Sequence, residues 1–242
     1  MEINKNTKIT VFGDSITKGV VTSKGRRQVA ECPAVSIIEN ALGVKITNHS
    51  TFGQTLSRLV SRGDIDKFLN DLNPADDNVV ILSLGGNDSD YDWPTVAQNP
   101  EFDHQPKTPP KEFERLLLDT IDRLQAAGVR VCLTSIAPID SKRFFDEIIS
   151  KQANPNRILT FLHGDIENLY RHQEYFNSIV IKCAQAKNCS FIDIRSKLLY
   201  CRNYLDFYCD DGIHPNELGQ RKIAEIILKQ LKKIGRASCR ER

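Results

Sequence analysis

Short runs of β-branched and other apolar residues alternate along the chain with longer segments whose apolar positions recur at helical spacing. A run of four to eight such residues is typical of a strand. A nearly continuous run, such as VVILSL at residues 79–84, is typical of a strand buried on both faces. We therefore expect five strands, over residues 8–12, 44–48, 79–84, 129–136 and 190–194.

The segments between these strands have helical periodicity, and several carry residues that start or stop a helix. Pro33 suits a first helical turn, while Gly43 and Gly128 suit the positions just after a helix. We expect helices over residues 33–42, 56–69, 110–127, 142–151, 156–187 with a kink at Gly164, and 216–232.

Strands that each lead into a helical crossover are typical of a parallel sheet covered on both faces. The sequence therefore predicts one domain over residues 1–234, a three-layer α/β/α sandwich with a flavodoxin-like, five-stranded parallel sheet. In such sheets the loops that follow the strands meet at one edge, and ligands bind there. Side chains that follow different strands are thus expected to form one site.

The last eight residues, 235–242, lack apolar periodicity and resemble the translation of a common sequencing adaptor, so we expect them to be a non-native tail. This tail holds three of the 33 basic and one of the 31 acidic residues, which leaves 30 of each. A balanced charge gives no reason to expect a nucleic acid or an anionic membrane as partner.

The composition, with 40% hydrophobic and 26% charged residues, is that of an ordinary soluble globular chain. No run approaches the ~18 apolar residues of a membrane span, and the first residues lack the apolar segment of a signal peptide, so we expect a cytoplasmic protein. The cysteines form no Cys-x-x-Cys pair and are expected to be reduced. The histidines form no ligand cluster, so no metal and no cofactor is expected.

Three short blocks follow the first, third and fifth predicted strands: GDS at residues 13–15, GGND at 85–88 and DGIHP at 211–215. Each block alone is also an ordinary turn composition, since Gly, Asp, Asn and Ser all favour turns and caps. The positions of the blocks after the strands bring them to the same edge of the predicted sheet. Their joint presence there favours a functional interpretation.

Together the blocks supply the groups that a serine nucleophile requires. A serine hydroxyl needs a base to take its proton, the base needs an orienting acid, and the oxyanion formed on attack needs donors. Ser15, His214 and the side-chain amide of Asn87 are candidates for the nucleophile, base and donor. Asp211 and Asp210 are both candidates for the acid, and the three-residue spacing to His214 favours Asp211.

The three blocks resemble those of the GDSL esterases and lipases, also called the SGNH hydrolase superfamily, and the resemblance covers nearly the whole chain. It implies that Ser15 is the nucleophile, His214 its base and Asp211 the orienting acid. It also implies an oxyanion hole formed by the Ser15 N–H, the Gly53 N–H and the Asn87 side chain. The first block reads Gly-Asp-Ser-Ile rather than Gly-Asp-Ser-Leu, a conservative departure.

A long loop over residues 88–111 leaves the sheet beside the proposed oxyanion hole, and loops of this length are commonly functional. Tyr91 and Trp93 are candidate substrate-binding residues, which could stack on a sugar ring or line an acyl pocket. The alternative is that Trp93 attaches the loop to the core. His104, on the same loop, is expected to be a surface polar residue, because no acid has a suitable spacing to it.

These features predict a metal-independent serine esterase that acts on small-molecule or oligosaccharide esters. We expect short acyl groups, including acetyl groups on carbohydrates, because no amphipathic anchor and no long apolar loop beside the site are evident in the sequence. Within the same chemistry the alternatives are a lysophospholipase, a thioesterase and an acyltransferase. A catalytically silent binding module is the alternative from a different class.

Overall fold

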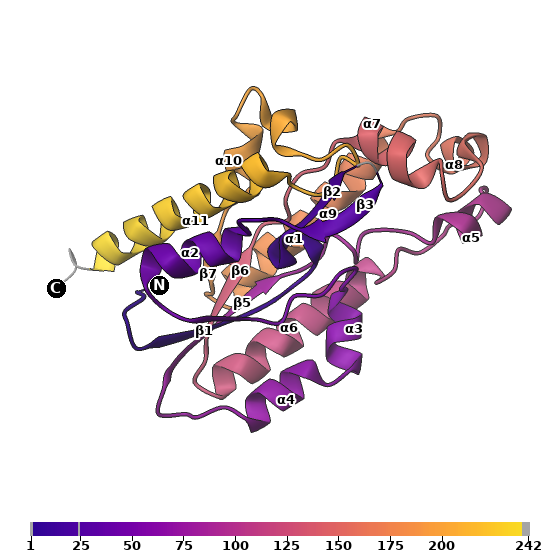
Figure 1. Ribbon diagram of the computed structural model, residues 1–242. Helices are drawn as coiled ribbons and strands as arrows, with labels where there is room; N and C mark the ends of the chain where they lie inside the picture. Colours follow the sequence, from indigo (N-terminus) through magenta and orange to yellow (C-terminus); the bar gives the residue numbers. More distant parts are fainter. Residues whose placement is uncertain (1, 24, 239–242) are drawn as a thin grey trace.

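Five parallel strands form the central sheet of the computed structural model, which describes residues 2–23 and 25–238. The strands lie in the order β4-β1-β5-β6-β7 (Figure 1). Their bounds are β1 Thr7–Gly13, β4 Ile46–Asn48, β5 Asp77–Ser83, β6 Arg130–Thr134 and β7 Ser190–Ile192. β1, the first strand of the chain, thus lies inside the sheet between β4 and β5, the next two strands of this sheet along the chain, as in flavodoxin-like sheets. The predicted five-stranded parallel sheet is confirmed.

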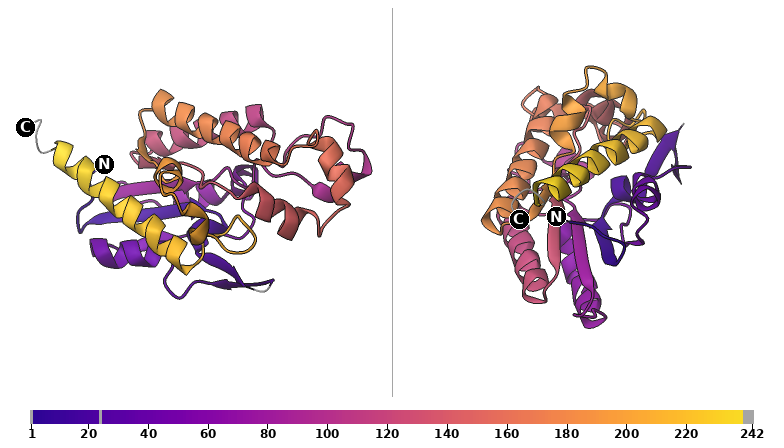
Figure 2. Two further views of the ribbon diagram at one scale, coloured as in Figure 1. Left: turned by 90° about the horizontal axis from the view of Figure 1, so that it is seen from above. Right: turned by 90° about the vertical axis from the view of Figure 1, so that its left-hand side faces the viewer.

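Helices cover both faces of this sheet, as the two views of Figure 2 show. One face packs against α2 (Ala34–Leu42) and α11 (Glu217–Ser238) through apolar residues such as Ile38, Ile192 and Ile223. The other face packs against α3 (Leu56–Ser61), α6 (Pro110–Ala126) and α9 (Glu167–Ala186), with α4 (Asp64–Asn70) alongside. Phe113 and Phe176 are fully buried on that side. The predicted three-layer α/β/α sandwich is therefore confirmed.

Two predicted helices are each divided in the structure. The helix expected over residues 56–69 breaks into α3 and α4 at Gly63, whose φ of 68° is left-handed and favours glycine. The helix expected over residues 156–187 becomes α8 (Pro155–Phe161) and α9, because His163 and Gly164 between them both have positive φ. Each break thus replaces one long predicted helix with two shorter helices.

Other predicted helices differ at their ends or in their type. The segment expected over residues 142–151 forms α7 (Ser141–Phe144) and then a π-helical turn, η1 (Phe145–Ile149). The last helix, expected to end at residue 232, extends to Ser238. The proposed non-native tail therefore begins inside α11, and its residues 239–242 lie outside the described part of the chain.

The sequence analysis missed several short elements that have no room for a clear periodicity. They include a two-stranded antiparallel hairpin, β2 (Val20–Ser23) and β3 (Arg26–Val29), which is separate from the main sheet. The others are α1 (Ser15–Lys18), α5 (Trp93–Gln98), α10 (Arg195–Leu199) and the 3₁₀ turn η2 (Tyr204–Phe207). Of these, the β2–β3 hairpin and α5 prove important for the site.

Four short elements, α5, α7, η1 and α8, project from one end of the sandwich, and we call them the helical arm (Figure 1). The arm has an apolar cluster of its own, in which Trp93, Phe144, Ile149 and Ile158 are buried. It therefore packs as a small second core beside the sheet.

None of the helices in the described part of the chain combines the length and apolar composition that crossing a bilayer requires.

Candidate active site

The loops at the carboxyl edge of the sheet bring the three sequence blocks together. Ser15 follows β1 as the first residue of α1, and His214 lies 199 positions further along the chain. His214 Nε2 is 2.9 Å from Ser15 Oγ, and His214 Nδ1 is 2.7 Å from Asp211 Oδ2. A serine, an imidazole and a carboxylate thus form one continuous line of hydrogen bonds.

The turn that carries Asp211 and His214 is fixed by local bonds. Asp211 Oδ1 accepts from the backbone N–H groups of Ile213 and His214 at 3.1 and 3.0 Å. Gly212 between them has a φ of 72°, and a Cβ atom at this position would lie 2.7 Å from the carbonyl oxygen of Asp140. The turn therefore requires glycine here, both for its conformation and for its close approach to α7.

Burial and hydrogen bonding act in opposite directions on Asp211, which is 5% exposed. Burial alone raises the pKa of this carboxyl, but hydrogen bonds from His214 and Thr22 lower it to about 2. The carboxylate is therefore charged at neutral pH and accepts a hydrogen bond from His214 Nδ1–H, which keeps that proton on the imidazole. This leaves Nε2 free to accept the proton of Ser15.

Thr22 is a site residue that the sequence analysis missed. Its hydroxyl donates to Asp211 Oδ2 at 2.6 Å, across 189 positions of sequence, and its backbone N–H donates to the Cys209 sulfur at 3.3 Å. Both bonds join the β2–β3 hairpin to the loop that carries the carboxylate and imidazole. A single threonine in a four-residue strand gives no sequence signal for such a role.

Asp14, which precedes Ser15, is a second buried carboxyl at the site. Its Oδ1 caps α1 by accepting from the Ile16 N–H at 2.9 Å, and its Oδ2 lies 3.5 Å from Asn87 Nδ2. The side chain is 6% exposed, and burial raises its pKa to about 6 despite the hydrogen bond from Ile16. Asp14 therefore holds the turn before the serine and titrates above the range of an exposed aspartate.

The predicted oxyanion donors lie in neighbouring loops that hydrogen bonds connect. Asn87 Nδ2 donates to the carbonyl of Gln54 at 3.1 Å, which joins this amide to the residue that follows Gly53. Asp88, fully buried, accepts from the Leu56 N–H at 2.9 Å and from the Thr108 hydroxyl at 2.7 Å. The loop after β4 and the loop after β5 are therefore held at a fixed separation.

Burial raises the pKa of Asp88 to about 6, although hydrogen bonds from Thr108 and Leu56 oppose this and the charge of Asp14 adds to it. The sequence analysis gave Asp88 no role, yet its place in the GGND block was the available signal. Its contacts make it the residue that joins the two donor loops.

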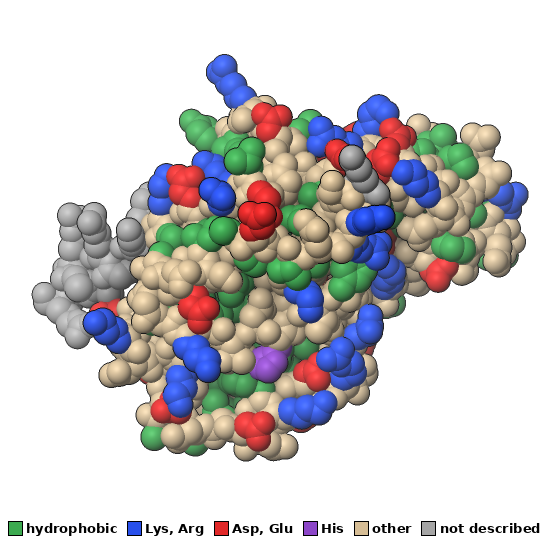
Figure 3. All heavy atoms as spheres, viewed as in Figure 1, with side chains coloured by type: hydrophobic (Ala, Val, Ile, Leu, Met, Phe, Trp, Pro, Cys, Tyr) green, Lys and Arg blue, Asp and Glu red, His purple; other side chains and the backbone are tan. Residues whose placement is uncertain are grey.

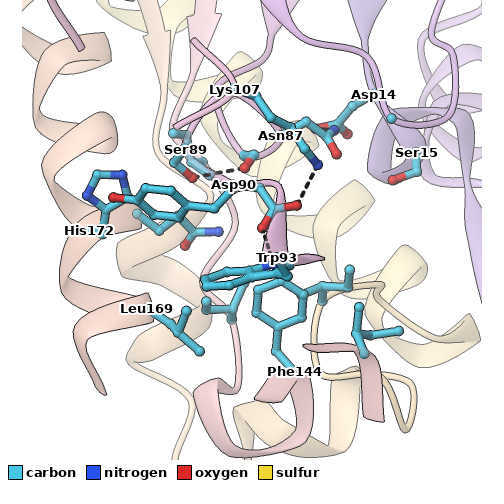
Figure 4. A pocket seen from close by; sticks show the side chains of 18 of the residues that line it. Asp14, Ser15, Asn87, Ser89, Asp90, Trp93, Lys107, Phe144, Leu169 and His172 are labelled. Carbon is cyan, nitrogen blue, oxygen red and sulfur yellow. Dashed lines mark hydrogen bonds and ion pairs between the residues drawn. The ribbon is translucent and has the colours of Figure 1, made fainter. Parts of the chain in front are cut away.

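A cavity of about 670 Å³ opens from Ser15 and Asn87 toward the helical arm (Figure 4). Apolar side chains of the arm and of the segments next to it form much of its wall: Trp93, Ile136, Ile139, Phe144, Ile148, Phe161, Leu162, Leu169 and Ile213. The sequence analysis found no long apolar loop beside the site, and no single loop forms this wall. Segments far apart in sequence form the wall together, so no single loop reveals it.

Tyr91 and Trp93 both line this cavity, but Trp93 is 2% exposed and lies in the apolar cluster of the arm. Its indole N–H donates to Asp90 Oδ1 at 2.9 Å. Stacking on a sugar ring needs an open ring face, and a Trp93 side chain this buried suits the alternative, in which it holds the loop, better than that role. Tyr91 packs against the rings of Phe161 and His172, with centroids 5.1 and 5.0 Å away.

The remaining titratable side chains give no metal site within the described residues, where no three His, Cys, Asp or Glu side chains are grouped to hold an ion. His104 lies 2.8 Å from the carbonyl of Asn99 through Nε2, away from the line of hydrogen bonds at Ser15.

A family model decides the relationship of the chain to known proteins. The model of the GDSL-like lipase/acylhydrolase family matches residues 11–222, a range that begins in β1 and ends in α11. The chain belongs to this family. The family resemblance drawn from the three sequence blocks is therefore confirmed.

Solved structures similar to this GDSL-like acylhydrolase have the same fold at low sequence identity. A variant of Axe2, an acetyl xylan esterase from Geobacillus stearothermophilus, superposes with a TM-score of 0.64 at 18% identity, over 96% of this chain and 97% of that one. A lipase/acylhydrolase from Enterococcus faecalis gives 0.62 at 18% identity, over 93% and 95%. TesA gives 0.60 at 20% identity, over 93% and 98%. No curated protein sequence matches the chain significantly.

Proposed function

We propose that this GDSL-like acylhydrolase is a serine-dependent carboxylic ester hydrolase. The observation that carries the proposal is the line of hydrogen bonds from Asp211 through His214 to Ser15, with distances of 2.7 and 2.9 Å, beside a cavity. Asn87 and Gly53 both line the same cavity, and the amide of Asn87 donates to the carbonyl of Gln54, the residue after Gly53. These groups supply a nucleophile, a base, an orienting acid and oxyanion donors.

In the proposed reaction, Ser15 Oγ attacks the ester carbonyl while His214 Nε2 takes the hydroxyl proton. The N–H groups of Ser15 and Gly53 and the amide of Asn87 stabilise the oxyanion. The bond between the carbonyl carbon and the alcohol oxygen then breaks, and that oxygen takes the proton from His214. Water attacks the acyl-enzyme with His214 again as base, which releases the acid and restores Ser15.

A fluorophosphonate probe and the Ser15→Ala variant test this proposal. The probe is expected to label the native protein on Ser15 and to leave Ser15→Ala unlabelled. Ser89→Ala is the matched control, because Ser89 also lines the cavity but its hydroxyl donates to the Gly86 carbonyl at 2.9 Å. Ser15→Ala and His214→Ala should each abolish ester hydrolysis with an unchanged fold. Near-native turnover by folded Ser15→Ala would end the serine-hydrolase proposal.

Short acyl esters, including acetyl groups on carbohydrates, are the substrates that the sequence predicts. The name of one structural neighbour, acetyl xylan esterase, is compatible with this proposal. Asp90 and Lys107 add polar groups to the cavity beside Asn87, and such groups can bind sugar hydroxyls. The two side chains also pair with each other at 2.6 Å, so each is already partly satisfied.

The apolar wall of the cavity favours a second candidate, an ester or thioester with a longer acyl chain. Each CH₂ group transferred from water to such a wall contributes about 0.8 kcal/mol, so four added groups could raise kcat/KM more than a hundredfold. An acetyl group would leave most of a 670 Å³ cavity unused. The name TesA belongs to a structural neighbour and decides nothing between the candidates.

The two candidates are separated by kcat/KM across acyl chains of two to twelve carbons on one leaving group. A maximum at acetyl to butyryl, with acetate released from acetylated oligosaccharides, supports the first candidate. A maximum at eight or more carbons supports the second. In that case Leu169→Trp, which narrows the cavity, should move the maximum to shorter chains. Leu218→Trp, at a position 60% exposed, is the control that should not.

A further inference from the structure

The β2–β3 hairpin presents one of its faces to the candidate active site. Thr22 and Arg27 are directly opposite in the antiparallel pair, so their side chains lie on the same face of the hairpin. Thr22 on that face donates to Asp211, and Arg27 lines the cavity. The pairing with Thr22 therefore places Arg27 on the face of the hairpin that is hydrogen-bonded to Asp211.

The guanidinium of Arg27 stacks in line with the imidazole that receives the proton. Arg27 Cζ lies 4.3 Å from the centroid of the Phe52 ring, and this ring stacks on His214 with centroids 5.9 Å apart and planes 20° apart. Phe52 thus separates a permanent positive charge from His214. The charge lies on the imidazole side of the nucleophile.

Arg27 differs from the other long cationic side chains at the cavity. Lys107 is paired with Asp90 and Arg171 with Asp165, each at 2.6 Å. Within the described residues, Arg27 has no carboxylate at ion-pair distance. Figure 3 shows Lys and Arg side chains gathered on the part of the surface where Figure 1 places the hairpin. The mouth of the cavity therefore has a positive charge available for a ligand.

We propose that Arg27 and Phe52 form a subsite for a negatively charged group on the alcohol part of the ester. This inference rests on the proposed function, because it uses the direction of proton transfer. His214 protonates the departing alcohol oxygen, so the alcohol part must leave on the imidazole side, where Phe52 and Arg27 lie. A phosphate or a carboxylate a few bonds from the ester oxygen would then meet the guanidinium, which binds both bidentately.

The proposal is tested with pairs of butyryl esters of which one member carries an anionic group and the other is neutral, with the release of butyrate as the readout. One pair is 1-butyrylglycerol and its 3-phosphate, and the other is 3-butyryloxypropanoate and its neutral methyl ester. The native enzyme is expected to hydrolyse the charged member of at least one pair with the higher kcat/KM. Arg27→Gln should lower kcat/KM for that charged ester about tenfold and change the neutral ester less than about twofold.

Arg26→Gln is the matched control. Arg26 is the neighbouring arginine on β3, its side chain points to the opposite face of the hairpin, and it does not line the cavity. It should change neither ester. In the native enzyme 0.5 M KCl should reduce the preference for the charged ester, and in Arg27→Gln it should have little effect.

The failure of this inference differs from the failure of the proposed function. Equal loss for charged and neutral esters in Arg27→Gln, an equal effect of Arg26→Gln, or no hydrolysis of either charged ester would overturn the role of Arg27. Hydrolysis that persists in folded Ser15→Ala would instead overturn the proposed function. In Arg27→Gln and Arg26→Gln, hydrolysis of the neutral ester reports whether the site is correctly folded.

Discussion

At the residue scale, the site depends on side chains whose contacts can be removed one at a time. The hydroxyl of Thr22 shares Asp211 Oδ2 with His214, at 2.6 and 2.7 Å. Without it, the buried carboxylate loses a donor and a fixed orientation. Thr22→Val is expected to lower kcat about tenfold with little change in KM, since a hydrogen bond to a charged group contributes about 1.5–3 kcal/mol.

Thr22→Ser keeps the hydroxyl and should retain most of the native kcat. If Thr22→Ser fell as far as Thr22→Val, packing of the hairpin rather than the hydrogen bond would be responsible. Thermal unfolding of both variants provides the control for stability.

Asn87 is the second residue with a separable role. Its amide is proposed to hold the oxyanion, which exists only in the transition state and the tetrahedral intermediate. Asn87→Ala should therefore lower kcat by roughly 10²–10³-fold with little change in KM. Steady-state kinetics on one ester measures both constants, and a rise in KM alone would assign Asn87 to substrate binding.

Asp14 makes the stability of the folded protein depend on pH. Its pKa of about 6 in the folded protein lies above the ordinary value of 3.8, because burial disfavours the charged carboxylate. The folded state therefore binds this proton more tightly than the unfolded state between these values. The contribution of Asp14 to stability falls as the pH rises from about 4 to about 6.

Asp14→Asn removes this titration and keeps an acceptor for the Ile16 N–H. Relative to the native protein, the variant should gain up to about 3 kcal/mol of unfolding free energy as the pH rises through this window. Urea unfolding at pH 4 and pH 7 measures the difference. An equal difference at both pH values would refute the assignment to Asp14.

At the element scale, the helical arm depends on a few large side chains because its helices are short. Trp93 begins α5, is 2% exposed, and contacts the cluster that includes residues of α7, η1 and α8. Trp93→Ala is expected to lower the unfolding free energy by about 3–5 kcal/mol. Phe102→Ala, at a position 67% exposed in the same loop, should change it by less than about 0.5 kcal/mol.

Urea unfolding followed by circular dichroism measures both variants. A loss for Phe102→Ala comparable with that for Trp93→Ala would mean that the loop, rather than the arm, determines stability. A loss of activity in folded Trp93→Ala would indicate that the arm also positions the site.

At the scale of the whole molecule, the described side chains of α11 pack against the sheet through buried residues between Ile223 and Leu231. Leu231 is 8% exposed and is the last of these buried residues. Deletion of residues 235–242, the proposed non-native tail, should change the unfolding free energy by less than about 0.5 kcal/mol and leave kcat/KM unchanged.

Leu231→Ala is the contrast, and it should lower the unfolding free energy by about 2–5 kcal/mol. The same urea unfolding measures the deletion and the substitution. A large loss on deletion would show that the tail belongs to the folded domain.

The sequence by itself determined the order and type of the main elements, because these follow from local patterns. The apolar run at residues 79–84 predicted β5. Gly43 and Gly128 predicted where α2 and α6 end. The positions of Ser15, Asn87, Asp211 and His214 after the first, third and fifth predicted strands were enough to predict that they meet, since parallel strands bring their carboxyl ends to one edge.

Only the tertiary structure decided which residues support these groups and what surrounds them. Thr22 and Asp211 are 189 positions apart, so no local pattern links them. The apolar wall is formed by residues from several separate segments between Trp93 and Ile213. Each segment contributes one or two apolar side chains, so no segment has a long apolar run that would predict the wall. The pKa values of Asp14 and Asp88 are raised because segments far away in the sequence bury these carboxyl groups. Local sequence fixes local conformation, whereas burial, charge and cavity shape arise from long-range packing.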